Sequence, residues 1–169
     1  MLLRTAGASR KRYCVATVVS RTVEVCLFRV DGAAPGYLLL RRASDESLYP
    51  GMWQFITGTV RTGERAVDAA RRELVEETGL VIKGFWIVPF VNSFYAAADD
   101  AVHMSPFFAA EVDKGSEPTL SPEHQEYAWC TREEADKTLV WPGQREGLRI
   151  VHEYIVGGRE ASRLLTIPV

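Results

Sequence analysis

The segment 58–80 constrains the fold of this chain most, because a glycine-rich stretch runs into a strongly helical one. Residues 66–78 are predicted as a helix that ends at Gly79, a position that suits a left-handed residue after the last turn. At about 100° per residue, one face of this helix is apolar, and we expect it to pack on a sheet. This stripe consists of Val67, Ala70, Leu74 and Val75.

Three carboxylates lie on an adjoining stripe of the same helix, because residues three and four apart are neighbours. They are Glu73, Glu76 and Glu77. Like charges at this spacing destabilise a helix by several tenths of a kcal/mol, so their clustering favours a cation site, and oxygen ligands suit Mg²⁺, Ca²⁺ or Mn²⁺. Ala66 and Ala69 are expected to leave open space above them for a substrate phosphate. A solvated face with a chance pair of glutamates is the alternative.

The rest of the chain predicts a domain of mixed strands and helices. Strand-rich segments are expected at 13–30, 37–42, 53–60 (interrupted by Gly58), 80–95, 102–112 and 127–130. A short helix is expected from the capping box at Thr131 to about residue 139, and a last helix from Pro142 to Gly157. Residues 13–169 are interpreted as one α+β domain, and residues 1–12 as a flexible tail, with a transit peptide as the alternative.

Composition narrows the classes of partner. The 169 residues carry 20 basic and 22 acidic side chains, a net charge of -2, which argues against binding a nucleic-acid polymer or an anionic membrane. No apolar run approaches the roughly 20 residues of a membrane span. Three scattered cysteines, Cys14, Cys26 and Cys130, are typical of reduced thiols in a cytoplasmic protein.

The segment 58–80 resembles the Nudix box at every defined position of that motif. The matching residues are Gly58, Glu64, Arg72, Glu73, Leu74, Glu76, Glu77, Gly79 and Leu80. The resemblance implies a Nudix hydrolase, with an α/β/α sandwich built on a mixed sheet. It also implies cleavage of nucleoside diphosphates linked to another moiety, with Mg²⁺, or Mn²⁺ in its place, as cofactor.

Weaker motifs around the box resemble the subgroup of dATP and dihydroneopterin triphosphate pyrophosphohydrolases. They are Trp53-Gln54 with Thr57-Gly58, Glu123-His124 with Tyr127 and Trp129, and Trp141 with Arg145. Thr57 departs from the glycine of many relatives. The implied reaction converts a nucleoside or pterin triphosphate to the monophosphate and pyrophosphate. The alternatives are hydrolysis of ADP-ribose or a dinucleoside polyphosphate, and a non-catalytic nucleotide-sensing module.

The resemblance also implies roles for individual residues. The expected metal ligands are the carbonyl of Gly58 and the carboxylates of Glu73, Glu76, Glu77 and Glu123. The general base is Glu76, Glu77 or Glu123, and Glu126 competes with Glu123 for the loop position. Arg72 is expected to support catalysis by hydrogen-bonding Glu64 and orienting the ligand helix, which Gly79 ends.

For the residues that could contact the substrate, the sequence leaves an alternative open in each case. Arg41, Arg42 and Arg61 are candidates for phosphate, with ordinary solvated arginines as the alternative. Trp53, Trp86, Phe94 and Tyr95 are candidates for stacking a base, against the alternative that they belong to the core. His103, His124 and His152 are interpreted as structural or surface residues. The expected partner is a small nucleotide or related triphosphate, and a homodimer is an open alternative.

Overall fold

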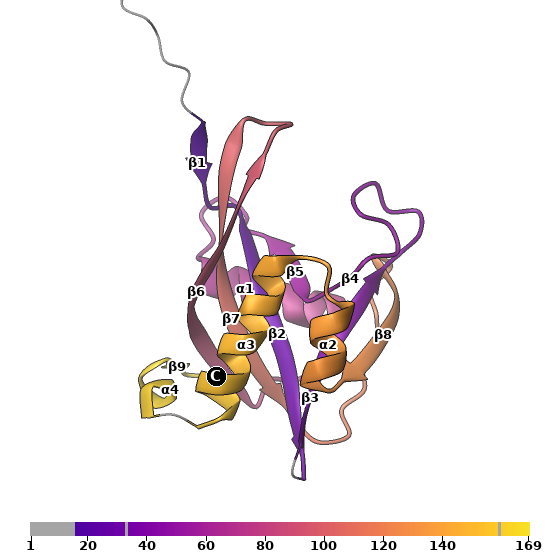
Figure 1. The fold of residues 1–169 in the computed structure, drawn as a ribbon, viewed down its shortest axis with the longest axis vertical. Helices are drawn as coiled ribbons and strands as arrows, with labels where there is room; N and C mark the ends of the chain where they lie inside the picture. The colour runs from indigo at the N-terminus through magenta and orange to yellow at the C-terminus, as the bar shows by residue number, and fades with distance from the viewer. Residues whose placement is uncertain (1–15, 33, 159) are drawn as a thin grey trace, which may run out of the picture.

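The computed structural model describes residues 16–32, 34–158 and 160–169, so the tail expected at 1–12 lies outside the described residues. Figure 1 shows a twisted mixed sheet with helices packed against it. The strands are β1 (Thr17–Val19), β2 (Thr22–Asp31), β3 (Ala34–Arg42), β4 (Trp53–Gln54), β5 (Ile56–Thr59), β6 (Gly84–Ala96), β7 (Ala101–Val112), β8 (His124–Cys130) and β9 (Thr166–Ile167). The helices are α1 (Ala66–Thr78), α2 (Arg132–Thr138), α3 (Pro142–Ile150), its π-helical continuation (Val151–Val156) and α4 (Glu160–Leu164).

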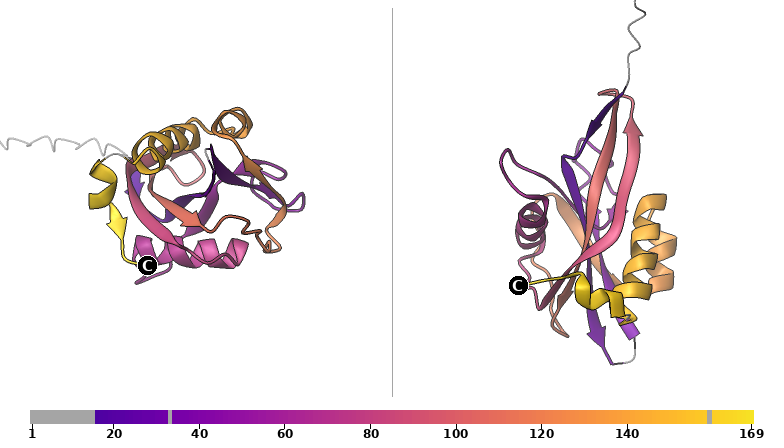
Figure 2. Two further views of the ribbon diagram at one scale, coloured as in Figure 1. Left: turned by 90° about the horizontal axis from the view of Figure 1, so that it is seen from below. Right: turned by 90° about the vertical axis from the view of Figure 1, so that its left-hand side faces the viewer.

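The sheet is the middle layer of an α/β/α sandwich, with α1 on one face and α2 and α3 on the other (Figure 2). Alternate residues of β2 face opposite layers, as the period of a strand requires. Val25 and Leu27 pack in the core under α1, whereas Cys26 and Phe28 pack in the core under α3. The predicted α+β class and mixed sheet are therefore confirmed.

The sheet divides where β2 changes its partner. Val25 and the residues before it pair with β5, whereas Phe28 and the residues after it pair with β3. The second half of β3, which ends at Arg42, pairs with β4 and β8. The chain crosses from β4 to β5 at Phe55, so the expected interruption of this extended segment at Gly58 is wrong. Gly58 lies inside β5, because the break comes where the chain leaves one partner strand for the next.

The buried face of α1 is rotated relative to the expected one. Val75 is 53% exposed, although it was expected in the packing stripe, whereas Glu77 is only 3% exposed. Ala69 is fully buried in the core under α1, so it does not border the expected open space above the carboxylates, and Ala66 is half-buried against the same core. The reason is that Gly58 has no side chain, so the edge of α1 that carries Glu73 comes close to β5 and turns Glu77 inward.

A buried polar contact helps fix α3 on the sheet. The side chain of Glu24 on β2 accepts a hydrogen bond from Asn92 on β6 at 2.7 Å, and it also bonds Gln144 on α3. Burial raises the pKa of Glu24 above its ordinary value. In the described part of the chain, no helix has the length and apolar character that a membrane span needs.

Candidate active site

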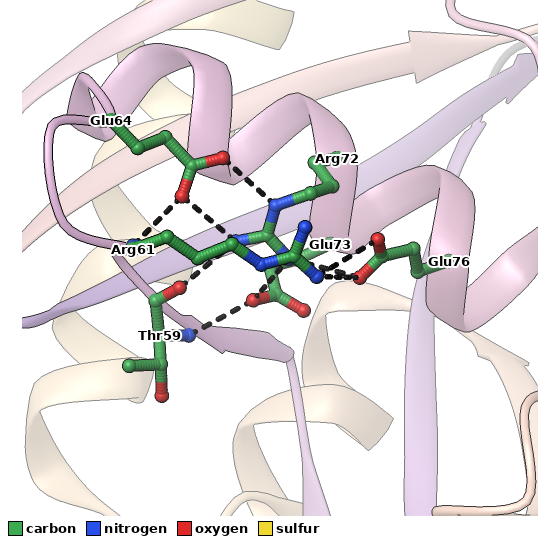
Figure 3. A network of polar contacts seen from close by, with 6 residues as sticks. All are labelled: Thr59, Arg61, Glu64, Arg72, Glu73 and Glu76. Atoms are coloured by element: carbon green, nitrogen blue, oxygen red, sulfur yellow. Dashed lines mark hydrogen bonds and ion pairs between the residues drawn. The ribbon is translucent and has the colours of Figure 1, made fainter.

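Arg72 lies at the centre of a network of charged side chains on α1 and the turn before it (Figure 3). Its guanidinium donates to both oxygens of Glu64, at 2.8 and 3.0 Å, and to the carbonyl of Thr59 at 2.9 Å. It also contacts Glu73 at 2.8 Å and Glu76 at 2.9 Å. The hydrogen bond between Arg72 and Glu64 that the sequence predicts is therefore present, and it ties the helix to the preceding turn.

The carboxylate of Glu64 is held in its charged form. Arg72 is the main cause, and the backbone N–H of Arg61, which donates at 2.9 Å, is the second. Together they lower the pKa of Glu64 to about 2. The same ion pairs raise the pKa of Arg72 above its ordinary value. The ion pair between Glu64 and Arg72 therefore stays charged at any physiological pH.

Glu73 lies directly against the backbone of β5. Its Oε1 accepts a hydrogen bond from the N–H of Thr59 at 3.0 Å. A Cβ atom on Gly58 would lie 1.9 Å from Cγ of Glu73, a separation that atoms do not tolerate. Only glycine at position 58 therefore lets this carboxylate reach the strand, which also brings it beside the carbonyls of β5.

Glu77 is the buried member of the acidic stripe, and its Oε2 atom has no hydrogen-bond partner. Burial is the main cause that raises the pKa of Glu77 to about 9, and the nearby charges of Glu73 and Glu123 add to it. An unpartnered buried polar group costs about 1–3 kcal/mol. The fold therefore buries an acidic side chain, and the described residues supply no group that would balance its charge when it ionises.

The loop that carries Glu123 is bound to the last turn of α1. Thr119 donates its N–H to the carbonyl of Thr78 at 2.8 Å, and Ser121 donates to the carbonyl of Glu77 at 3.3 Å. These bonds satisfy carbonyls that the end of a helix leaves free. On the other side, the N–H of Ala43 donates to the carbonyl of Glu123 at 2.8 Å. The loop thus brings Glu123, which is exposed, beside Glu77.

The carboxylates do not converge on one point in this arrangement. Among the residues that the structure describes, no three His, Cys, Asp or Glu side chains form a ready-made metal site. Arg72 draws Glu73 and Glu76 to itself, and Glu77 faces His124. The donor set nevertheless fits a hard divalent cation, because a cation would balance the unpartnered oxygen of Glu77 and compete with Arg72 for Glu73.

The two arginines at the end of β3 hold loops. Arg41 donates to the carbonyl of Gly51 and to Glu126, at 3.1 and 3.0 Å. Arg42 donates to the carbonyl of Leu48 and to Glu46, both at 2.8 Å. Both side chains thereby fasten the loop 43–51. Their predicted contacts with phosphate stay predictions.

Arg61 differs from these two arginines, because its side chain is 63% exposed and has one acidic partner among the described residues, Glu76, at 3.2 Å. It therefore extends over the exposed side of the acidic stripe, where it is free to change partners (Figure 3).

The aromatic residues that the sequence suggests for stacking a base lie in separate parts of the structure. Trp53 and Trp86 are half-buried against the core under α3. Phe94 and Tyr95 lie on the β6–β7 hairpin, where Phe94 stacks on His103 and Tyr95 donates to Asp100. The structure does not gather these side chains around the acidic stripe, and their role in base stacking stays a prediction.

His124 lies near the acidic stripe, although from the sequence we interpret it as a structural or surface residue and assign it no role in the site. Its ring is fully buried, and its Nε2 lies 3.8 Å from Oε2 of Glu77. Burial lowers its pKa to about 4, and the charge of Arg42 adds to the effect, so the ring is neutral at pH 7. The signal in the sequence was the motif that joins His124 to Glu123, Tyr127 and Trp129, because a histidine without a partner at ligand spacing indicates nothing by itself.

Comparison with known proteins identifies the family. The family model described as the NUDIX domain matches residues 20–150. The nucleoside triphosphatase NudI of Escherichia coli is 31% identical over 121 residues, which make up 68% of this chain and 84% of that protein. The solved structure of a C. elegans Ap4A hydrolase binary complex has a TM-score of 0.68 at 24% identity, covering 82% of this chain and 99% of that one.

The structure of the E. coli dihydroneopterin triphosphate pyrophosphohydrolase has a TM-score of 0.64 at 20% identity, covering 83% of this chain and 99% of that one. At these identities the solved structures concern the fold alone. The family model and the likeness to NudI extend over most of the chain and include the segment 58–80. This chain therefore belongs to the Nudix family of hydrolases.

Proposed function

We propose that the chain hydrolyses a pyrophosphate bond of a nucleoside triphosphate, or of a related pterin triphosphate, and releases the monophosphate and pyrophosphate. The observation that carries this proposal is the buried, unpartnered carboxylate oxygen of Glu77 beside Glu73 and Glu123. It fits a site that is completed by a divalent cation. The likeness to NudI, a nucleoside triphosphatase, supports the class of substrate.

The cation would be Mg²⁺, with Mn²⁺ as a substitute, because every candidate ligand is an oxygen. Glu73 and Glu77 would hold it, and the carbonyl of Gly58 and the carboxylate of Glu76 would complete the donor set. When bound, the ion supplies neutralisation of the charge that develops on the phosphate oxygens during attack by water. Arg72 would keep Glu73 and Glu76 in place on α1.

Glu123 is the best placed of the three candidates for general base. Glu77 is buried, and Glu76 is bound by both Arg61 and Arg72. Glu123 is exposed and lies on a loop fastened at both ends beside Glu77. It would therefore take the proton from the attacking water. Arg61, with its exposed guanidinium, would turn from Glu76 to the substrate phosphates.

The test is a steady-state screen for released pyrophosphate, and for phosphate after added pyrophosphatase. The substrates are dNTPs, NTPs, ADP-ribose and dinucleoside polyphosphates, each with Mg²⁺ and with EDTA. We expect metal-dependent release of pyrophosphate from a nucleoside triphosphate. The Glu77→Gln variant should lose at least about 100-fold in turnover, and Glu133→Gln on the exposed part of α2 is the matched control.

Two outcomes would contradict the proposal. A preference for ADP-ribose or a dinucleoside polyphosphate would keep the family and replace the substrate. No metal-dependent release from any substrate would favour a nucleotide-sensing module.

A cytoplasmic location and a homodimer stay predictions.

A further inference from the structure

His124 and Glu77 face each other in the interior without a hydrogen bond between them. The side chain of His124 is 0% exposed and that of Glu77 is 4% exposed, and Nε2 lies 3.8 Å from Oε2. Neither ring nitrogen, nor Oε2 of Glu77, has a hydrogen-bond partner among the described residues. Buried polar atoms are almost always paired, so two facing unpaired groups need an explanation.

The backbone fixes the position of His124 independently of its ring. The N–H of His124 donates to the carbonyl of Ser121 at 3.1 Å, and the residue pairs with Arg42 in the β3–β8 ladder. The ring is thus aimed at Glu77 by the strand and the loop. Closing the separation to a hydrogen bond of about 2.9 Å requires about 0.9 Å of side-chain movement.

We infer that His124 is a positioning residue for Glu77. In the metal-loaded site its Nε2–H would donate to one lone pair of Oε2 of Glu77, which would fix the orientation of the carboxylate and leave its remaining lone pairs for the cation. Hydrogen bonds of this kind to ligand side chains commonly set metal affinity. A neutral imidazole has one N–H to donate, which is all that this role needs. The inference rests on the proposed function, because it assumes that Glu77 is a ligand.

A packing role for His124 makes a different prediction. If the ring only fills space, then phenylalanine, which has a similar shape and no donor, should serve as well. If the ring orients Glu77, then phenylalanine should fail and glutamine should succeed, because its amide nitrogen reaches a position close to that of Nε2. Asparagine is too short to reach Glu77.

The experiment measures the binding of Mn²⁺ alone, without nucleotide, by electron paramagnetic resonance of the free ion. The variants are His124→Phe, His124→Gln, His124→Asn and Glu77→Gln. The matched control is His103→Phe, because His103 also lies near a carboxylate, that of Asp99 at 3.0 Å, but on the β6–β7 hairpin. Unfolding midpoints in EDTA report on the fold of each variant.

We expect His124→Phe to weaken Mn²⁺ binding about 10- to 100-fold, and His124→Gln to stay within about threefold of wild type. His103→Phe should bind as wild type. In the Glu77→Gln background, His124→Phe should cause no further loss. If a folded His124→Phe variant binds Mn²⁺ with wild-type affinity, this inference is wrong and the proposed function is unaffected. If that variant does not fold, equal losses in His124→Gln and His124→Asn overturn it. No Mn²⁺ binding by the wild type would refute the proposed function as well.

Discussion

Glu77 carries the largest electrostatic penalty among the residues of the site. Burial is the main cause of its raised pKa, of about 9, and the neighbouring carboxylates Glu73 and Glu123 add to it. At pH 7 the folded protein therefore keeps a proton on Glu77 that the unfolded chain gives up. A residue that serves stability alone would not be an acid at this position, because glutamine has nearly the same shape and no charge.

This penalty predicts that Glu77→Gln stabilises the metal-free protein. Urea unfolding in EDTA at pH 8 should show a gain of about 1–3 kcal/mol over wild type, because the variant avoids burial of an ionisable group. The same variant should show no rise in unfolding midpoint on addition of Mn²⁺. Glu133→Gln, which changes an exposed carboxylate, should match wild type in both measurements. A less stable Glu77→Gln variant would contradict this account of the site.

The sequence predicts the polar contacts of single residues unevenly. The bond between Glu64 and Arg72 was predictable, because Glu64 lies just before the start of α1 and Arg72 is the oppositely charged residue within its reach on the helix. The burial of Glu77 and the exposure of Val75 do not, because hydrophobic patterns place the apolar residue inside. Functional sites break such rules, so the misplaced residue was itself a sign of the site.

At the scale of elements, the contact between β5 and α1 determines the geometry of the site. The helix comes close enough for Glu73 to accept a hydrogen bond from Thr59, since Gly58 presents no side chain. The same close approach rotates α1 and buries Glu77. One residue without a side chain thus positions two acidic side chains.

Gly58→Ala should therefore displace Glu73 and weaken Mn²⁺ binding at least about tenfold. Stability should fall by about 1–3 kcal/mol, the usual cost of overpacking. The matched control is Gly36→Ala on β3, where the nearest atoms to an added Cβ are at an ordinary 3.7 Å. Calorimetric titration with Mn²⁺ and urea unfolding measure the two effects. Equal affinity in the two variants would show that the approach of Glu73 to β5 is not needed for binding.

The end of α1 gives a second prediction at this scale. Gly79 has φ of 65°, and its N–H donates to the carbonyl of Val75. Alanine in the left-handed region costs about 1–2 kcal/mol, whereas asparagine is better tolerated. Gly79→Ala should therefore lower the free energy of unfolding by about that amount, with a smaller loss in Gly79→Asn. An unchanged stability in Gly79→Ala would mean that the loop 119–121, not this residue, ends the helix.

Most helices and strands were predictable because they are amphipathic or β-branched over several residues. The residues at which strands begin were less predictable. β6 begins at Gly84 and not at Leu80, and β8 begins at His124, before the expected Tyr127. The short elements α4 and β9 were not predicted, because five and two residues carry too little periodicity. Strand pairing determines these ends, and it involves residues far apart in the sequence.

At the scale of the whole molecule, the site is assembled from three separate segments. Residues 58–59 of β5 and residues 72–77 of α1 come from the box, which the sequence alone reveals. Glu123 ends a loop that bonds to α1 through Ser121 and to Ala43, the residue after β3, and His124 is the first residue of β8. The motif around Glu123 predicted this residue as part of the site, but only the folded structure shows the loop bonds that bring it beside Glu77.

This assembly couples proton binding to folding through two groups of opposite sign. The pKa of Glu77 is raised from 4.5 to about 9, so the contribution of Glu77 to the metal-free stability is complete below pH 4.5 and falls as pH rises toward 9. The pKa of His124 is lowered from 6.5 to about 4, so its contribution grows as pH rises from 4 to 6.5. Of these two groups, only Glu77 changes its contribution above pH 7, which makes pH 7–9 the informative range for the pair.

In that range a cation must displace the proton of Glu77, so Mn²⁺ affinity should rise about tenfold per pH unit from pH 7 and level off above pH 9. Calorimetry in two buffers of different ionisation enthalpy should show about one proton released per ion at pH 7 and almost none at pH 10. Over the same range, unfolding in EDTA should lose up to about 1.4 kcal/mol per pH unit. Glu77→Gln should abolish both dependences. Binding without proton release at pH 7 would mean that Glu77 is already ionised in the metal-free protein.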